Sequence, residues 1–211
     1  MFFHENAGNL GLRMDYLAMV YHELNCDIVV VAYRGYSHSS GVPSEYGLNL
    51  DAAAIIDYVL SSKNEMASWY SNRGGIFVVG RSLGGAVAAN VISGLSSDKL
   101  NFIDGLILEN TWTSLDDLVF DYFWFMAALR KLILMNHWNT LELIPKLDKV
   151  PMLHVSGSRD SILSQLHTVR LVNANSNPRF KPHVYREELG GHSDTWLVQK
   201  DVYRSKVEAF M

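Results

Sequence analysis

One serine of this sequence stands in a setting that could make its hydroxyl a nucleophile. Ser82 lies at the centre of the stretch Gly-Arg-Ser-Leu-Gly, residues 80–84. A compact apolar run, residues 76–79, comes before it, and small and apolar residues, 86–92, come after it. We therefore expect a strand, a tight turn and a buried helix to meet at Ser82. Such a turn lifts the hydroxyl above the sheet edge, and the glycines on either side leave room for it. The pattern predicts a nucleophile elbow.

Two further side chains are expected to activate this hydroxyl. A serine needs an imidazole to take its proton, and the imidazole needs a carboxylate to fix its tautomer. In open parallel sheets such groups gather beyond the carboxyl ends of the strands. Asp160 follows a predicted strand, and His192 follows paired glycines after the last predicted strand, which completes the chain order Ser, Asp, His. Glu109, at the end of an earlier strand, is the alternative orienting acid. Acyl transfer is the chemistry that these residues predict.

An anionic intermediate in acyl transfer needs two backbone N–H donors held in place beforehand. The first is expected from Leu83, the residue after the nucleophile, at the start of a helix where amide groups point outward. The second should come from a loop after an earlier strand. Asn6 is the predicted donor, with Glu5 as the fallback.

The remaining pattern predicts strands that alternate with helices, and hence a mostly parallel sheet with helices on both faces. The expected strands are residues 1–4, 28–32, 76–79, 102–109, 151–156 and 183–185. The expected helices are residues 10–24, 44–60, 86–92, 163–172 and 195–210. Leu12 should lie on the buried face of the first helix. Asp194 should cap the last helix.

A long connection, residues 111–149, is expected to form a small helical cap over the strand ends, inserted in a single domain of residues 1–211. Long connections tend to be functional. Its aromatic stretch, residues 118–126, could bind an acyl chain or touch a membrane surface. Packing of these aromatic side chains on the main domain is the interpretation we favour, since such stripes usually belong to a core.

Composition removes several classes of function. The 211 residues are 48% hydrophobic and 19% charged, enough for one buried core. A net charge of -4 without basic runs gives no support for nucleic-acid binding. The single cysteine, Cys26, excludes an intrachain disulfide and a cysteine-based zinc cluster. No apolar run is long enough to span a bilayer. We expect no metal or organic cofactor, and the compartment is undetermined.

Six blocks, in this order, resemble the alpha/beta hydrolase domain-containing protein 13 family, also called bud emergence protein 46-like. The blocks are residues 4–9 (HENAGN), 33–36 (YRGY), 80–88 (GRSLGGAVA), 109–111 (ENT), 156–160 (SGSRD) and 191–196 (GHSDTW). The resemblance covers nearly the whole chain. It implies an α/β-hydrolase fold with Ser82, Asp160 and His192 as catalytic triad. It also implies substrates that are acyl esters or thioesters, including palmitoylated proteins, and membrane association through a segment before the catalytic domain.

The sequence departs from the family pattern in two places. Glu5 stands where the family has glycine, and a carboxylate near an anionic intermediate would oppose it unless the side chain turns away. The chain also begins where the family's third strand ends, so two leading strands are expected to be missing and a sheet edge exposed. These departures keep one alternative to an esterase or thioesterase open, a weakly active, membrane-associated scaffold protein. A serine peptidase is a further alternative, because the same triad cleaves amides and no feature of the sequence excludes it.

Overall fold

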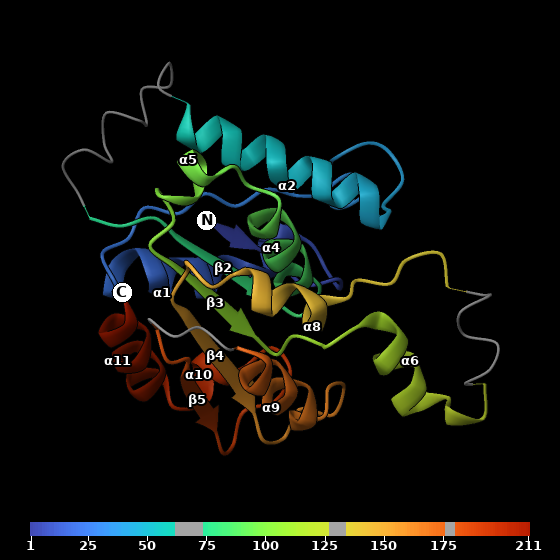
Figure 1. Ribbon diagram of the computed structural model, residues 1–211. Coiled ribbons are helices and arrows are strands. Elements are labelled where there is room, and N and C mark those ends of the chain that lie inside the picture. The colour runs from blue at the N-terminus through green and yellow to red at the C-terminus, as the bar shows by residue number, and fades with distance from the viewer. Residues whose placement is uncertain (62–73, 127–133, 176–179) are drawn as a thin grey trace.

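The computed structural model describes residues 1–61, 74–126, 134–175 and 180–211. Its centre is a sheet of five parallel strands in the order β1-β2-β3-β4-β5 (Figure 1). The strands are β1 (Phe2–Phe3), β2 (Phe77–Arg81), β3 (Gly105–Glu109), β4 (Met152–Gly157) and β5 (His183–Glu187). Because neighbouring strands run the same way, all of their carboxyl ends lie at one edge of the sheet. The expected parallel sheet is confirmed.

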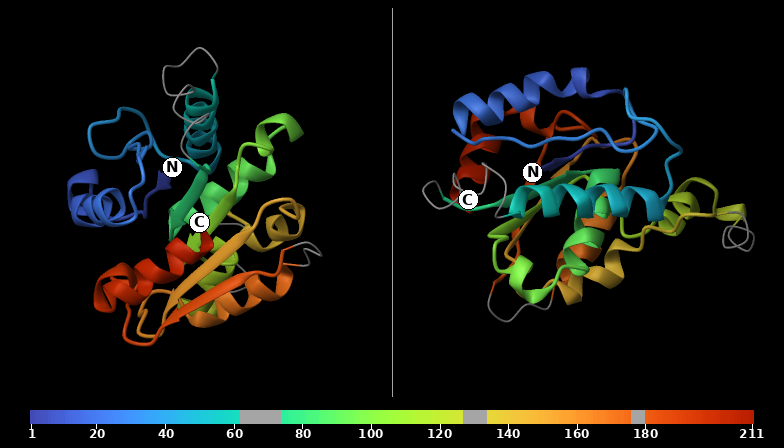
Figure 2. Two further views of the ribbon diagram at one scale, coloured as in Figure 1. Left: turned by 90° about the vertical axis from the view of Figure 1, so that its left-hand side faces the viewer. Right: turned by 90° about the horizontal axis from the view of Figure 1, so that it is seen from above.

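Helices connect these strands and cover the sheet. The α-helices are α1 (Met14–Glu23), α2 (Glu45–Leu60), α4 (Leu83–Ser93), α5 (Ser97–Leu100), α6 (Leu115–Tyr122), α8 (Thr140–Leu143), α9 (Gln165–Ala174), α10 (Thr195–Val198) and α11 (Lys200–Phe210). Short 3-10 helices are η1 (Leu10–Arg13), η2 (Trp124–Met126) and η3 (Ile144–Lys146). Figure 2 shows α1 and α11 on one side of the sheet and α2 and α4 on the other.

Side chains alternate between the two faces along each strand, and both faces are buried. On β3, Leu106 and Leu108 join the core beneath α2 and α4, while Ile107 joins the core beneath α1 and α11. Phe3 and Phe2 divide in the same way at the end of β1. Strands that are buried on both faces need continuous apolar runs, which is the pattern in the sequence.

The β-branched run at residues 28–32 does not form the strand that we expected. Val30 makes only an isolated parallel bridge to Phe2, whose N–H donates to Val29 O at 2.8 Å. Within the described residues this segment pairs with β1 alone, and its side chains are half-buried. A single ladder partner leaves half of its backbone groups without the regular bonds of a strand.

Helix boundaries follow the capping signals more closely than the apolar spacing. The helix expected from residue 44 begins at Glu45, and Ser44 caps it, because its hydroxyl accepts a hydrogen bond from Gly47 N. Leu12 was expected to be buried but is 77% exposed, because it lies on η1, whose tighter turn rotates it away from the face that α1 buries. The expected helix over residues 195–210 is divided into α10 and α11 at Gln199.

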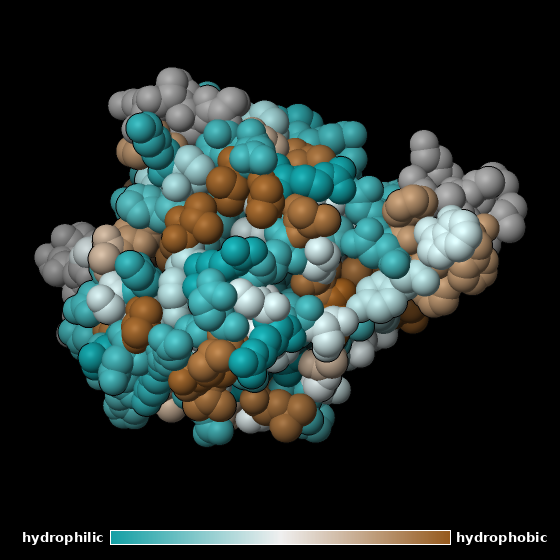
Figure 3. All heavy atoms as spheres, turned by 90° about the horizontal axis from the view of Figure 1, so that it is seen from below, coloured by the Kyte–Doolittle hydropathy of each residue, from teal (hydrophilic) through white to brown (hydrophobic). Residues whose placement is uncertain are grey.

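The connection between β3 and β4 carries α6, η2, α8 and η3. Figure 1 shows α6 projecting from the body of the molecule, and Figure 3 shows white to brown side chains gathered on this arm. Trp124 is 70% exposed and Phe125 is 68% exposed, so the expected packing of these aromatics on the main domain is wrong. Residues 127–133 of the expected cap lie outside the described residues. The single domain and its cap stay predictions.

Candidate active site

Ser82 lies where β2 turns sharply into α4. Its backbone has φ 54° and ψ −119°, a conformation that L-residues rarely adopt and that costs of the order of 1–3 kcal/mol. Neighbouring groups hold it there: Ser82 N donates to Glu109 O at 2.9 Å, and Gly85 N donates to Ser82 O at 3.0 Å. The predicted strand, turn and helix at Ser82 are confirmed.

Two glycines make this turn possible, because their lack of a side chain lets neighbouring backbone segments approach closely. A Cβ at Gly80 would overlap the carbonyl of Gly84, and a Cβ at Gly84 would overlap the carbonyl of Phe3. The first contact closes the turn on itself. The second brings the first turn of α4 against the end of β1, so the loop that follows β1 starts beside the nucleophile candidate.

The structure brings the three predicted side chains together in one hydrogen-bonded relay. His192 Nε2 lies 2.9 Å from Ser82 Oγ, and His192 Nδ1 lies 2.7 Å from Asp160 Oδ2. Asp160 Oδ1 accepts hydrogen bonds from Ile162 N and Leu163 N, both at 2.8 Å. The carboxylate is therefore held by backbone on one oxygen and faces the imidazole with the other.

The relay is largely shielded from solvent but remains reachable. The Asp160 side chain is 2% exposed and that of His192 is 14% exposed. Ser82 is 5% exposed. Burial strengthens the attraction between the carboxylate and the imidazole, because the protein interior screens electrostatic interactions less than water does.

Asn110 holds the loop that carries His192, a role that our sequence reasoning missed. Its Nδ2 donates to His192 O at 2.7 Å and to Gly191 O at 3.1 Å, and its Oδ1 accepts from Gly157 N at 2.9 Å. It thereby ties the ends of β3 and β4 to the histidine loop. The available signal was its place directly after a buried strand, in the block Glu-Asn-Thr. Asp194 also serves this loop, since its carboxylate accepts from Gly191 N and makes no capping bond to α10.

Glu109, the alternative orienting acid, has other partners. It is fully buried, its Oε2 accepts from Arg81 at 3.0 Å and from Tyr203 at 3.2 Å, and its Oε1 accepts from Thr195. Both of its carboxylate oxygens are therefore engaged away from His192. Although burial disfavours the Arg81 charge, Glu109 beside it raises the pKa of Arg81 above its usual value. Glu109 is thus a structural anchor below the elbow.

The two predicted oxyanion donors lie on segments that meet beside Ser82. Leu83 is the first residue of α4, where backbone N–H groups have no partner within the helix. Asn6 lies in the loop after β1, and its side-chain oxygen accepts from the hydroxyl of Tyr36 at 2.5 Å. Glu5 directs its carboxylate to Arg13, at 3.2 Å. The side chain whose charge was expected to oppose an anion is therefore paired with a cation.

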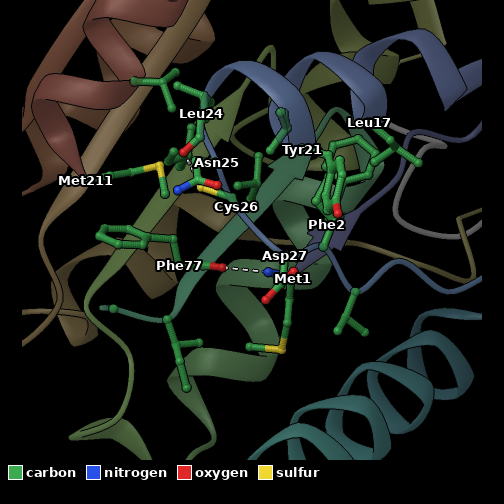
Figure 4. Close-up of a pocket in the computed structure, with 18 of the residues that line it drawn as sticks. Met1, Phe2, Leu17, Tyr21, Leu24, Asn25, Cys26, Asp27, Phe77 and Met211 are labelled. Atoms are coloured by element: carbon green, nitrogen blue, oxygen red, sulfur yellow. Dashed lines mark hydrogen bonds between the residues drawn. The ribbon is translucent and has the colours of Figure 1, made fainter. Parts of the chain in front are cut away.

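A cavity of about 820 Å³ lies at the opposite ends of the strands from the relay, where β1 and β2 begin (Figure 4). Its wall includes Phe77, whose carbonyl accepts a hydrogen bond from the Met1 amino group at 2.7 Å. Phe77 begins β2 and Ser82 follows its end, so roughly 16 Å of extended strand separates them. This cavity is not part of the relay. Among the described residues, no group of three or more His, Cys, Asp or Glu side chains is placed to hold a metal ion.

The chain is similar to several curated proteins over almost its full length. It is 32% identical over 197 residues to protein bem46 of Schizosaccharomyces pombe, covering 93% of this chain and 62% of that protein. It is 34% identical over 215 residues to the alpha/beta hydrolase domain-containing protein WAV2 of Arabidopsis thaliana, covering 96% and 66%. It is 31% identical over 209 residues to an uncharacterized membrane protein of Saccharomyces cerevisiae, covering 98% and 68%. The chain thus spans about two thirds of the length of these relatives.

Comparison of structures gives the same fold. An esterase of Pyrococcus furiosus superposes with a TM-score of 0.73 at 17% identity, covering 99% of this chain and 78% of that one. No protein-family model matches the chain. Among the described residues, no helix combines the length and the hydropathy needed to cross a bilayer. The predicted α/β-hydrolase fold is confirmed, and the identities over most of each sequence place the chain in the alpha/beta hydrolase domain-containing protein 13 family, the bud emergence protein 46-like proteins.

Proposed function

We propose that this protein is a serine hydrolase that cleaves carboxylic esters or thioesters through an acyl-enzyme. The observation that carries the proposal is the unbroken relay from Ser82 Oγ through His192 to Asp160, with contacts of 2.9 and 2.7 Å. Such a relay gives an alcohol the general base that it lacks on its own. The strained backbone at Ser82 supports the same conclusion, because strain of this kind is retained where function uses it.

The proposed reaction follows from these contacts. Ser82 Oγ attacks the acyl carbon while His192 Nε2 takes the hydroxyl proton, and Asp160 stabilises the imidazolium that forms. His192 then gives the proton to the departing alkoxide or thiolate as the bond to the acyl carbon breaks. Water attacks the acyl-enzyme, with His192 again accepting a proton and returning it to Ser82. The products are a carboxylic acid and an alcohol or thiol.

Two backbone donors, Leu83 N–H and Asn6 N–H, stabilise the negative charge that develops on the acyl oxygen. Leu83 belongs to the first turn of α4, where unpaired N–H groups and the helix dipole both favour an anion. Preorganised donors of this kind are usually a large part of transition-state stabilisation in acyl transfer, and loss of one of them lowers kcat about 10²–10³-fold. With Glu5 paired to Arg13, its charge does not argue for a weakly active scaffold.

Substrates presented at a membrane surface are the class that we propose. Aromatic side chains on η2 and the end of α6 are exposed, as Tyr122, Trp124 and Phe125 show, and aromatic rings favour the interface between lipid and water. One relative carries the description of a membrane protein. An acyl chain attached to a lipid or to a protein would reach the site from such a surface.

A fluorophosphonate probe tests the proposal directly. The unaltered protein should be labelled on Ser82 and should hydrolyse p-nitrophenyl butyrate and acyl thioesters, and Ser82→Ala should abolish both. Ser93→Ala is the matched control, since Ser93 lies at the far end of the same helix and its hydroxyl donates to Asn90 O at 2.7 Å. Absence of labelling and of turnover in the folded, unaltered protein would overturn the proposed function. A panel of esters and thioesters of graded chain length then separates the two substrate classes.

A further inference from the structure

The loop after β1, residues 5–9, folds around one buried guanidinium group. Arg13 is 3% exposed and donates to the backbone carbonyl oxygens of Glu5, at 3.2 Å, Ala7 and Asn9. Its Nε also donates to the Glu5 carboxylate at 3.2 Å. The planar fork of an arginine offers several donors in fixed directions, so these bonds set the direction of three carbonyl groups at once.

The carbonyl direction fixes the direction of the next amide. In a trans peptide the C=O and the N–H point to opposite sides. The oxygen of the Glu5–Asn6 peptide accepts from Arg13 and also from His4 Nδ1, at 2.7 Å. Because this oxygen can only accept, His4 carries its proton on Nδ1. The peptide is thus held by two donors, and Asn6 N–H points away from both of them.

The same peptide follows the strand that lies beside the strand of the elbow. Phe3, two residues before Glu5, pairs in the parallel register of β1 and β2 with Gly80, two residues before Ser82. The first turn of α4 lies directly against the start of this loop, because a Cβ at Gly84 would overlap the carbonyl groups of Phe3 and His4.

We propose that Arg13 is a positioning residue that aims Asn6 N–H at the oxyanion formed when Ser82 attacks an acyl group. Glu5 takes part by neutralising the buried Arg13, and its carboxylate is thereby kept off the reacting oxygen. This inference rests on the proposed function and extends it to residues that touch neither the nucleophile nor the substrate. Glu5 is a supporting residue of the oxyanion loop, and its charge does not inhibit the reaction.

Lysine cannot replace this arginine. An ammonium group presents its donors from one point and cannot bridge the carbonyls that the fork holds. Loss of one oxyanion donor lowers kcat about 10²–10³-fold in enzymes of this kind. We expect Arg13→Lys to lower kcat about 100-fold and to change KM less than about threefold, since the donor acts chiefly on the charge of the transition state.

The experiment compares an oxygen ester with the matching thionoester, whose developing sulfur anion accepts hydrogen bonds weakly. Unaltered protein should strongly prefer the oxygen ester, and Arg13→Lys should reduce this preference about tenfold, because the lost donor affected the oxyanion most. Arg34→Lys is the matched control. Arg34 binds the carboxylate of Asp51 on α2 at 2.7 Å. The rates at which the Arg34→Lys variant hydrolyses the oxygen ester and the thionoester should both stay within about threefold of those of the unaltered protein.

A second variant covers the case in which Arg13→Lys does not fold. The double variant Glu5→Gln/Arg13→Gln removes both charges together and leaves no unpaired buried charge, and it should show the same fall in kcat and in the preference for the oxygen ester. Unchanged kcat, or a loss of kcat with the preference for the oxygen ester intact, would overturn the role of Arg13. An unaltered protein that is neither labelled on Ser82 nor active would instead overturn the proposed function.

Discussion

Asp160→Asn is the substitution that examines the proposed relay most closely, because the structure fixes how the amide would sit. Asp160 Oδ1 accepts from Ile162 N and Leu163 N, both at 2.8 Å, and only an oxygen can accept these bonds. The amide NH₂ would therefore take the place of Oδ2 and face His192 Nδ1, at the present 2.7 Å. It would donate to Nδ1 and drive the ring proton to Nε2, the atom that must accept the proton of Ser82.

The expected loss follows from this change of tautomer. Where an orienting carboxylate of a serine relay becomes an amide with its geometry kept, kcat falls about 10⁴-fold, or about 5 kcal/mol at 1.36 kcal/mol per tenfold. Stability should change little, because the backbone bonds of Asp160 remain. Steady-state hydrolysis of p-nitrophenyl butyrate, with urea unfolding of the same preparations, measures both. A kcat within tenfold of the unaltered protein would refute the assignment of Asp160.

Three further substitutions test the surroundings of the site. Glu109→Gln breaks a buried ion pair and should therefore lower the free energy of unfolding, measured in urea, by about 3–5 kcal/mol. The folded fraction should stay active. A pH-independent loss of kcat as large as that of a relay residue would contradict the structural role of Glu109. Burial lowers the pKa of His154 to about 4. As pH falls, the unfolded chain therefore protonates its His154 before the folded protein does, and up to about 3 kcal/mol of stability should be lost between about pH 6.5 and pH 4. Urea midpoints across this range should depend less on pH in His154→Gln, and an unchanged slope would count against the assignment. Gly84→Ala should destabilise by about 3 kcal/mol or more, because its Cβ meets the backbone carbonyl of Phe3, which cannot move aside. Gly94→Ala, whose Cβ would lie 3.7 Å from the nearest atom, is the control and should leave the urea midpoint near that of the unaltered protein.

Much of the site could be predicted because its information is local. Ser82 needs a tight strand-to-helix turn, and the glycines around it and the apolar residues on both sides are what such a turn requires, so a stretch of about 20 residues identified it. Asp160 and His192 follow strands whose carboxyl ends must share one edge of a parallel sheet. Their meeting was therefore a consequence of topology, which the alternation of strands and helices already indicated.

Other outcomes depended on partners that are distant in sequence. Spacing left Asp160 and Glu109 as rival acids, and what separated them was the buried Arg81 beneath Glu109 and the backbone donors beside Asp160. Asn110 gave no catalytic signal of its own, yet its amide joins two strand ends to the histidine loop. The run at residues 28–32 has strand propensity, but pairing with β1 alone gave it only an isolated bridge.

By itself the sequence determined the fold class and the order of the elements and predicted the residues of the relay, because backbone sterics at glycine and the burial of apolar runs act over a few residues. Tertiary structure alone decided where charges point. The sequence predicts that Glu5 places a carboxylate beside an anionic intermediate. In the folded protein this carboxylate is paired with Arg13 instead. The physical reason is that a buried charge must find its counter-charge in space, and the chain brings that partner close only when it folds.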